Sequence, residues 1–338
     1  MRCWLRTWAA LLAAVVLAVS GLAAAAADKL PAWNEGPAKA AIVDLVADTT
    51  AEGSPGFVPP EERVATFDQD GTLWVEQPIY TQLVYCLDRL DALATANPAL
   101  AKTEPYRTAL TRDPAALKAL VVHDWRKILA LTLTGMDIET LAGEVTDWLK
   151  TARNPRWDRP YTDLVYQPML ELLGYLRANG YRTYIVTGGG QDFVRTYSDP
   201  VYGIPVEQVV GTSFETRFDY GTDGTARLVI EPKLFFDDDF DGKARGIALF
   251  TGRRPFLAAG NSTGDREMLE YTTAGQGHRL GLLVLHDDAT REYAYGPAEG
   301  LPDSKIGTFT QGLYDEATAR GWTVIRMSRD WNRIFPFE

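Results

Sequence analysis

The chain has 338 residues, of which 46% are hydrophobic, and it carries a formal net charge of -11 at pH 7. This length is sufficient for one large α/β domain that carries an insertion. The acidic balance argues against a nucleic-acid binder, because nucleic-acid phosphates attract basic surfaces. Of the two cysteines, Cys3 and Cys86, the first lies in a predicted leader, so no internal disulfide is expected.

The first 27 residues are typical of an export signal. Arg2 and Arg6 give a positive start, and an apolar run over residues 9–22 leads to the alanines of residues 23–27. Cleavage before Asp28 removes two arginines and no acid, which takes the net charge from -11 to -13. The apolar run is short for a membrane-spanning helix. We therefore expect an exported protein, periplasmic or secreted, without stable membrane insertion after signal cleavage.

A lead segment, residues 28–62, precedes the first predicted strand. It contains a short predicted helix over residues 37–47 and ends in a stretch rich in glycine and proline. The β-branched and aromatic run 63–67 then predicts a strand that ends in Asp68-Gln69-Asp70-Gly71-Thr72.

Asp68 and Asp70 lie two residues apart at the end of this strand. Because alternate side chains of a strand point the same way, both carboxylates are predicted to face one site, and Gly71 allows close approach of the backbone. One carboxylate can act as a nucleophile and the other as a proton donor and acceptor, and both can bind a hard cation. The alternative is an ordinary Asp-Gly turn.

Residues 78–163 are predicted to form a helical insertion between two parts of an α/β core, residues 63–77 and 164–338. The insertion shows amphipathic patterning without a good strand. Its predicted helices are 79–97, 105–120, 121–134 and 138–151, the last with Asp137 as its N-cap.

Helix and strand patterns alternate from residue 164 onward. A helix over residues 165–179 ends at Gly180, and the strands predicted after it are 181–186, 208–211, 255–259 and 279–285. Continuous apolar strands separated by helices predict a parallel sheet that is covered on both faces. Residues 214–218 and 227–230 flank a turn-rich segment and predict a hairpin inserted into this scheme.

Further polar clusters follow these strands, at the carboxyl ends where such sheets bind ligands. Thr187, with Gly188, Gly189 and Gly190, offers a hydroxyl and backbone N–H groups as an anion cradle at a helix start. Its alternative is a flexible glycine turn. Residues 260–265 combine small residues with one amide and one carboxylate, which suits a metal or a positioning network, and a helix cap is the alternative.

The last cluster is Lys243 with the acidic run before it. A lysine is the point charge expected to neutralise phosphate oxygens, and Lys233 is a rival candidate. Residues 237–242 match the first half of a calcium-binding loop, but its twelfth position is Ala248, where a bidentate glutamate is required. A polar turn is the better interpretation of this run.

Four motifs in this order resemble those of the haloacid dehalogenase superfamily. They are DQDGT at 68–72, a strand followed by Thr187, then Lys243, and GNSTGD at 260–265. The resemblance covers nearly the whole mature chain, from Val64 to Leu285. The segments around the motifs look like the exported branch related to phosphoserine phosphatase. The resemblance implies an α/β fold with a Rossmann-like parallel sheet and an inserted helical cap.

The resemblance also implies a role for each motif residue. Asp68 would be the nucleophile that forms an aspartyl-phosphate, and Asp70 the general acid/base whose backbone carbonyl binds Mg²⁺. Thr187 would hold a phosphate oxygen. Lys243 would bridge the nucleophile and the phosphate.

Position 261 departs from the superfamily pattern, which commonly has an acidic magnesium ligand there. The Mg²⁺ ligands that follow from the resemblance are Asp68, Asp70, Asn261 and Asp265. An amide oxygen can coordinate magnesium but brings less charge than a carboxylate. We therefore expect weaker metal affinity rather than a different reaction.

A cap over the site would exclude water and contact the leaving group. Trp74 and Glu76, where the chain enters the cap, pair an aromatic face with a carboxylate, which suits an amine or quaternary ammonium group on a substrate. A packed hinge and a solvated residue are the alternatives. His123, His278 and His286 lack ligand-like spacing and are assigned to packing, caps or the surface.

Together, these motifs predict a Mg²⁺-dependent phosphomonoesterase whose partner is a small phosphorylated metabolite and not nucleic acid. A dehalogenase is the nearest rival within the superfamily, but it has no need of the Asp70 carboxylate. A non-catalytic phospholigand-binding protein with a weakened metal site at Asn261 is the rival from a different class.

Overall fold

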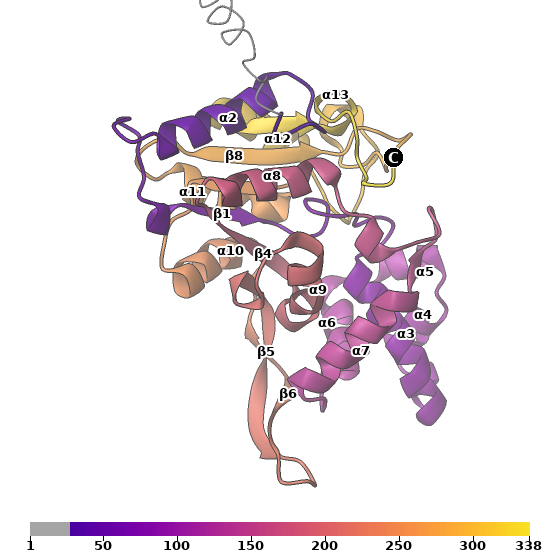
Figure 1. Cartoon of the computed structure of the whole chain (residues 1–338). Coiled ribbons are helices and arrows are strands. Elements are labelled where there is room, and N and C mark those ends of the chain that lie inside the picture. The colour runs from indigo at the N-terminus through magenta and orange to yellow at the C-terminus, as the bar shows by residue number, and fades with distance from the viewer. Residues whose placement is uncertain (1–27) are drawn as a thin grey trace, which may run out of the picture.

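The computed structural model describes residues 28–338, and the predicted signal peptide, residues 1–27, lies outside the described residues. Residues 28–338 build a seven-stranded sheet in the order β6-β5-β4-β1-β7-β8-β9 (Figure 1). Its strands are β1 (Val64–Phe67), β4 (Arg182–Gly190), β5 (Val209–Tyr220), β6 (Ala226–Phe236), β7 (Leu257–Gly260), β8 (Leu280–Leu285) and β9 (Thr323–Arg326). Neighbouring strands pair parallel except β5 and β6, which are antiparallel. The predicted α/β fold with a Rossmann-like parallel sheet is confirmed.

The central strand, β1, lies between β4 and β7, and all four of its residues are buried. Its last residue, Phe67, is in register with Ile185 of β4 and Ala259 of β7. Because parallel strands end at the same edge of a sheet, the segments after these three strands begin side by side. This register brings Asp68 close to Thr187 and Asn261, which lie 119 and 193 residues further along the chain.

Alternate strand residues face two apolar clusters, one on each side of the sheet. Ile185 and Val284 pack in a cluster with α2 and α8, whereas Val186 and Leu285 pack with α11 and α12. This alternation confirms that both faces are covered. The helices of this part are α2 (Pro37–Thr50), α8 (Gln167–Ala178), α9 (Gln191–Tyr202), α10 (Asp241–Gly246), α11 (Arg266–Thr273), α12 (Gln311–Arg320) and α13 (Met327–Asp330).

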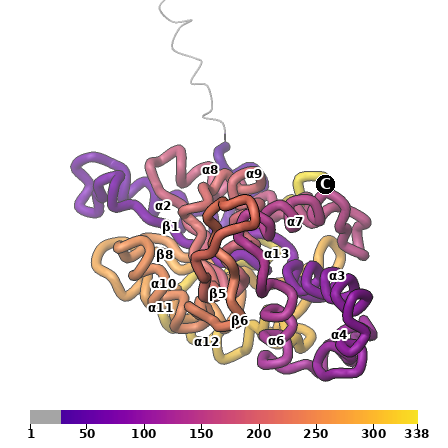
Figure 2. The backbone as a smooth tube through the Cα atoms, turned by 90° about the horizontal axis from the view of Figure 1, so that it is seen from below, coloured from indigo at the N-terminus to yellow at the C-terminus, as the bar shows by residue number. Residues whose placement is uncertain are grey.

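The helices between β1 and α8 occupy the segment predicted as the cap, and this segment, called the cap below, lies beside α9 and β6 (Figures 1 and 2). They are α3 (Thr81–Ala96), α4 (Tyr106–Leu110), α5 (Pro114–Ala119), α6 (Val122–Leu133) and α7 (Ile138–Thr151). The turn between α6 and α7 pairs with β6 through its backbone. The N–H of Gly135 donates to the carbonyl of Ile230 at 2.9 Å, and the N–H of Ile230 donates to the carbonyl of Met136 at 2.8 Å.

One predicted cap helix, 105–120, is wrong, because the structure divides it into α4 and α5. The break lies at Arg112, which has a φ of 52°, and at Asp113, whose side chain accepts a hydrogen bond of 2.8 Å from the N–H of Ala116. Pro114 starts α5, since proline cannot donate to a preceding turn but fits the first turn of a helix.

The predicted hairpin is longer than expected and is not a separate insertion. The first residues of β5 pair parallel with β4, and from Ser213 to Tyr220 the same strand pairs antiparallel with β6. Figure 1 shows the far end of this hairpin projecting from the sheet. A β-bulge or irregularity near Phe214 accompanies the change of partner.

Several short elements were not predicted. They include β9 with α12 and α13 in the C-terminal part, and a two-stranded sheet of β2 (Arg153–Asn154) and β3 (Arg159–Pro160) at the end of the cap segment. Short 3₁₀ turns occupy η1 (Pro60–Glu62), η2 (Leu100–Lys102), η3 (Tyr161–Asp163), η4 (Val206–Gln208), η6 (Thr263–Asp265) and η7 (Ala298–Gly300), and η5 (Ile247–Thr251) is a π-helical turn. No helix within residues 28–338 is long and apolar enough to cross a membrane.

Candidate active site

Asp68 follows β1 directly and is almost completely buried, with 7% of its surface exposed. Its backbone N–H donates to the carbonyl of Ala259 at 2.9 Å, which extends the pairing with β7. One carboxylate oxygen accepts a hydrogen bond from the ammonium group of Lys243, and the other faces the hydroxyl of Thr72 at 3.4 Å. Asp68 is thus a buried carboxylate with a direct cationic partner.

A tight turn after Asp68 requires glycine at position 71. Gly71 has a φ of 75°, and its N–H donates to the carbonyl of Trp74 at 2.8 Å. A Cβ at this position would lie 2.1 Å from Nδ2 of Asn261. Both the backbone conformation and the lack of space therefore exclude a side chain here, as the sequence predicted for a close backbone approach.

Asp70 is oriented by Trp74, whose indole N–H donates to its Oδ1 at 2.7 Å. The indole ring stacks on Tyr197 of α9, with ring centroids 4.6 Å apart. The other oxygen of Asp70 lies on the side of the Thr187 loop, 3.8 Å from the place that a Cβ on Gly189 would occupy. Burial raises the pKa of Asp70 to about 6.

Lys243 lies in the first turn of α10, 3% exposed, and joins Asp68 to Asp265. Its ammonium nitrogen is 2.5 Å from Oδ1 of Asp265, which is itself fully buried. Burial alone would lower the pKa of Lys243, but the two carboxylates outweigh that effect and raise it. Lys233, the rival candidate, lies on β6 and pairs with Glu215 at 2.6 Å.

The glycine-rich loop at the end of β4 is ordered by two side chains. The hydroxyl of Thr187 accepts a hydrogen bond of 3.0 Å from the N–H of Gly189, and the side-chain oxygen of Gln82 accepts one of 2.7 Å from the N–H of Gly190. Helix α9 starts at Gln191, directly after the loop. The predicted anion cradle thus lies at a helix N-terminus, close to Asp70.

Asn261 is buried beneath the turn of Gly71. Its side-chain oxygen accepts a hydrogen bond of 3.2 Å from the hydroxyl of Thr72, which also faces Asp68. Its side-chain nitrogen donates to Oε1 of Glu76 at 2.6 Å. The amide oxygen of Asn261 therefore faces the Thr72 hydroxyl that Asp68 also faces, and the amide nitrogen faces Glu76.

Asp265 has both oxygens engaged by other groups. Oδ1 contacts Lys243, and Oδ2 accepts hydrogen bonds from the backbone N–H groups of Asn261 at 2.9 Å and Ser262 at 3.0 Å. This carboxylate therefore fixes both the lysine and the turn after β7. The helix-cap alternative for residues 260–265 describes part of this role, since Ser262 caps η6.

Trp74 and Glu76 do not form the open aromatic and acidic face that the sequence suggested for a cationic substrate group. Trp74 is 1% exposed and Glu76 is 2% exposed. Their polar atoms contact protein partners, Asp70 for Trp74, and Asn261 and Tyr295 for Glu76. Trp74 matches the packed-hinge alternative, whereas Glu76 is neither a solvated residue nor an open binding group.

The segment after β8 contacts the turn that follows Asp68, which the sequence did not indicate. The Nε2 atom of His286 lies 2.8 Å from the carbonyl oxygen of Gly71, and Nδ1 lies 3.1 Å from Glu292. The imidazole ring stacks on Tyr295, whose hydroxyl donates to Glu76 at 2.8 Å. The sequence assigned His286 to packing, caps or the surface, and no local spacing signals a contact with a residue 215 positions earlier.

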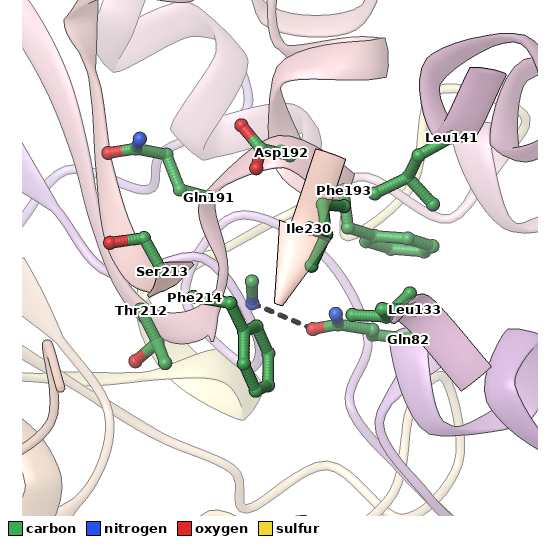
Figure 3. A pocket seen from close by; sticks show the side chains of 11 residues that line it. Gln82, Leu133, Leu141, Gln191, Asp192, Phe193, Thr212, Ser213, Phe214 and Ile230 are labelled. Carbon is green, nitrogen blue, oxygen red and sulfur yellow. Dashed lines mark hydrogen bonds between the residues drawn. The ribbon is translucent and has the colours of Figure 1, made fainter. Parts of the chain in front are cut away.

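Gln82 is a second residue that sequence reasoning missed. It lies in the first turn of α3, 7% exposed, and its Nε2 atom has no hydrogen-bond partner among residues 28–338. Figure 3 shows its amide beside a pocket between the cap and the core. The pocket is lined by Gln82, Leu133, Leu141, Gly190, Gln191, Asp192, Phe193, Thr212, Ser213, Phe214 and Ile230. It adjoins the glycine-rich loop, but Asp68 and Asp70 do not line it.

Residues 237–240 of the acidic run before Lys243 lie outside helices and strands, and Asp241 and Gly242 begin α10. Among residues 28–338, no group of three or more His, Cys, Asp or Glu side chains is arranged to hold a metal ion.

Asp238 is fully buried, and neither of its oxygens has a hydrogen-bond partner within the described residues. Burial raises the pKa of Asp238 to about 8.

The oxygen atoms around Asp68 suit a hard cation only if amide and carbonyl oxygens take part. Asp68 and Asn261 each turn one side-chain oxygen to the hydroxyl of Thr72. The buried Glu76 and the partly exposed Asp70 add further carboxyl groups, and Lys243 is the cation that contacts Asp68. This set of oxygens fits the ligand preference of Mg²⁺.

Carboxylates, a lysine and a glycine-rich loop lie together at neighbouring strand ends of the parallel sheet. This arrangement is that of a Rossmann-like α/β protein with a polar site at the carboxyl edge of its sheet. Residues 65–270 match the family of haloacid dehalogenase-like hydrolases, and the chain belongs to this family. The family assignment made from the motifs is confirmed. Its relation to an exported branch stays a prediction.

Some solved structures are similar to this chain at low sequence identity. A protein with unknown function from Bordetella pertussis Tohama I is 16% identical, with a TM-score of 0.50, and the match covers 78% of this chain and 98% of that chain. A phosphoserine phosphohydrolase-like protein from Francisella tularensis subsp. tularensis SCHU S4 is 16% identical, with a TM-score of 0.37, and the match covers 66% of this chain and 88% of that chain. Comparison with curated proteins gives no match.

Proposed function

We propose that this protein is a Mg²⁺-dependent phosphomonoesterase that acts on small phosphorylated metabolites through an aspartyl-phosphate intermediate. The observation that carries the proposal is the environment of Asp68. Its buried carboxylate, at the end of the central strand, contacts Lys243 and lies between the glycine-rich loop and Asn261. Membership of a hydrolase family supports the same conclusion.

In the first step, an oxygen of Asp68 attacks the phosphorus atom, and the bond between phosphorus and the ester oxygen breaks. Asp70 transfers its carboxyl proton to that oxygen, which leaves as an alcohol. The contact with Trp74 supports this role, because it fixes one oxygen of Asp70 and leaves the other toward the loop.

In the second step, Asp70 removes a proton from a water molecule, and the water oxygen attacks the phosphorus atom. The bond between phosphorus and Asp68 breaks, so inorganic phosphate leaves and the Asp68 carboxylate is restored. Lys243, the hydroxyl of Thr187 and the backbone N–H groups at the start of α9 are the donors proposed to bind the phosphate oxygens.

We propose Asp68, the backbone carbonyl of Asp70 and the side-chain oxygen of Asn261 as the ligands of Mg²⁺. Bound there, the ion supplies positive charge that offsets the carboxylates and polarises a phosphate oxygen. Asp265 is less suited to the role of a ligand, because Lys243 and two backbone N–H groups already engage its oxygens. Its proposed role is to anchor Lys243.

Export is also a proposal. The support is the leader composition of residues 1–27. Asp28, the first residue after the proposed cleavage point, pairs with Lys39 of α2 at 2.6 Å. Mass spectrometry of the protein recovered from outside the cytoplasm is expected to give an N-terminus at Asp28, and an intact leader on that protein would contradict cleavage.

The direct test is hydrolysis of a small artificial phosphate ester and of a panel of metabolite phosphates by the mature chain. We expect release of phosphate that depends on Mg²⁺ and stops with a chelator. Acid quenching during turnover is expected to trap phosphate on Asp68, detectable as a mass increase of the peptide that contains it. Saturable phosphate binding without turnover on any ester would instead support the non-catalytic alternative.

A further inference from the structure

Asparagine at position 261 raises a problem of orientation that an aspartate would not have. An aspartate presents an oxygen to a cation whichever way its carboxylate turns. An amide has an oxygen on one side and an N–H₂ group of similar size on the other, so a turned amide would present hydrogen-bond donors to the metal. A metal site that uses Asn261 therefore needs a neighbour that fixes the amide.

We infer that Glu76 is that neighbour and serves as a positioning residue for the metal site. This inference rests on the proposed function, because it concerns the same Mg²⁺. Oε1 of Glu76 accepts the hydrogen bond from Nδ2 of Asn261 at 2.6 Å, and the opposite atom, Oδ1, then faces Thr72 and Asp68. Because Oε1 also accepts the hydrogen bond of the Tyr295 hydroxyl, it serves as an acceptor at this position and selects one of the two orientations of the amide.

Glu76 is itself held in place. The hydroxyl of Tyr295 donates to the same oxygen at 2.8 Å, and Tyr295 stacks on His286. Two glycines leave the space that Oε1 occupies. A Cβ on Gly71 would lie 2.3 Å from Oε1, and a Cβ on Gly307 would lie 1.8 Å from it. The position of the glutamate is thus fixed from three parts of the chain.

This arrangement explains why a carboxylate eight residues after Asp68 is buried rather than exposed to a substrate. Its exposed fraction is 2%, and its contacts are with Asn261 and Tyr295. Position 261 lacks an acidic group, but Glu76 supplies one as the hydrogen-bond partner of Asn261. Outer-layer partners of metal ligands typically change metal affinity by about 10- to 100-fold when removed.

The test is a series of variants with Mg²⁺ affinity measured by calorimetry on the mature chain, independent of turnover. Glu76→Gln retains a side-chain oxygen that can accept from Asn261, so its affinity is expected to stay within about 3-fold of the original. Glu76→Met removes the acceptor at similar size, and a loss of about 10-fold or more is expected. Tyr295→Phe removes only the support of Glu76, and a smaller loss is expected.

The control is Asp330→Leu, which also replaces a buried, hydrogen-bonded carboxylate by an apolar side chain, in α13, where the partners of Asp330 are Arg326 and Arg329. It is expected to leave Mg²⁺ affinity unchanged. The decisive variant combines Glu76→Met with Asn261→Asp. Because an aspartate needs no orienting partner, Asn261→Asp is expected to restore most of the affinity that Glu76→Met loses.

The inference is overturned by unchanged affinity in Glu76→Met, by equal losses in Glu76→Gln and Glu76→Met, or by a failure of Asn261→Asp to restore binding. Each of these results leaves the proposed function in place if the original chain binds Mg²⁺ and hydrolyses esters. Absence of Mg²⁺ binding in the original chain would remove both. Should Glu76→Met fail to fold, Tyr295→Phe decides, and unchanged affinity there would overturn the inference.

Discussion

The strand ends of the core and the helices of the cap contribute to the candidate site in different ways. At the strand ends, backbone register fixes where Asp68, Thr187 and Asn261 lie relative to one another. The cap reaches the glycine-rich loop through the side chain of Gln82. The core therefore holds the groups of the proposed reaction, and differences in the cap could change which substrates fit without moving those groups.

Replacing the proposed nucleophile is expected to have the largest effect. Asp68→Asn keeps the size of the side chain but removes the attacking carboxylate, and Lys243 retains its partner Asp265. Turnover should fall by about 10⁴-fold or more, to the background of the assay, while thermal unfolding stays cooperative. Measurable turnover with a trapped phosphate elsewhere in the chain would assign the nucleophile to another residue.

Replacing Asp70 is expected to reduce turnover less than replacing Asp68. Asp70→Asn still accepts from the indole of Trp74 but has no proton to exchange, and kcat is expected to fall by about 10²-fold or more. The loss should be smaller for an ester whose leaving group departs without protonation, which steady-state kinetics on a series of phenyl phosphates can measure. An equal loss across that series would contradict a role in proton transfer.

A smaller effect is expected from the cap. Gln82→Leu leaves the N–H of Gly190 without its acceptor, which costs on the order of 1–3 kcal/mol, so kcat/KM is expected to fall by about 10-fold. The matched control is Gln77→Leu, since Gln77 contacts Ser304 and Ile306 rather than the loop. Equal losses in the two variants would show that Gln82 acts through general stability of the cap.

Replacing Asp238 is expected to change turnover least of all and to change how the stability of the chain depends on pH. Because burial raises its pKa to about 8, the folded chain keeps a proton that the unfolded chain releases near pH 4. The contribution of this group to stability is therefore present below about pH 4 and is lost as the pH rises to about 8, by a few kcal/mol.

Asp238→Asn cannot ionise and should remove this part of the pH dependence. Relative to the original chain, the variant should gain unfolding free energy between about pH 4 and pH 8 and show a constant difference above that range. Asp241→Asn is the control, because the side chain of Asp241 is 76% exposed. Parallel pH curves for the original chain and Asp238→Asn, measured by urea unfolding, would contradict a protonated Asp238.

The parts of the fold that follow from local sequence were predictable. The apolar strands with polar residues at their ends predicted both the parallel sheet and the edge where Asp68, Asp70, Thr187 and Lys243 meet. The division of the helix at Arg112 was missed, because an amphipathic pattern continues across Pro114. The length of β5 was missed because its two halves pair with different strands.

The support around the site was not predictable from one sequence, because its contacts join distant positions. The partner of Asn261 is Glu76, 185 residues earlier, and the partner of Gly190 is Gln82, 108 residues earlier. Neither pair has a spacing that marks it. Asn261 itself was recognisable as a departure from the superfamily pattern, but the residue that compensates for it becomes visible only in the folded chain.

The backbone pairing between the cap and the hairpin has a consequence for how substrates enter. Ile230 accepts a hydrogen bond from the N–H of Gly135 and donates one to the carbonyl of Met136, so the turn between α6 and α7 is bonded to β6 through the backbone. Separation of the cap from β6 must break these bonds and expose both amides to water. The rate of amide hydrogen exchange at Gly135 and Ile230 therefore reports how often the cap leaves the core.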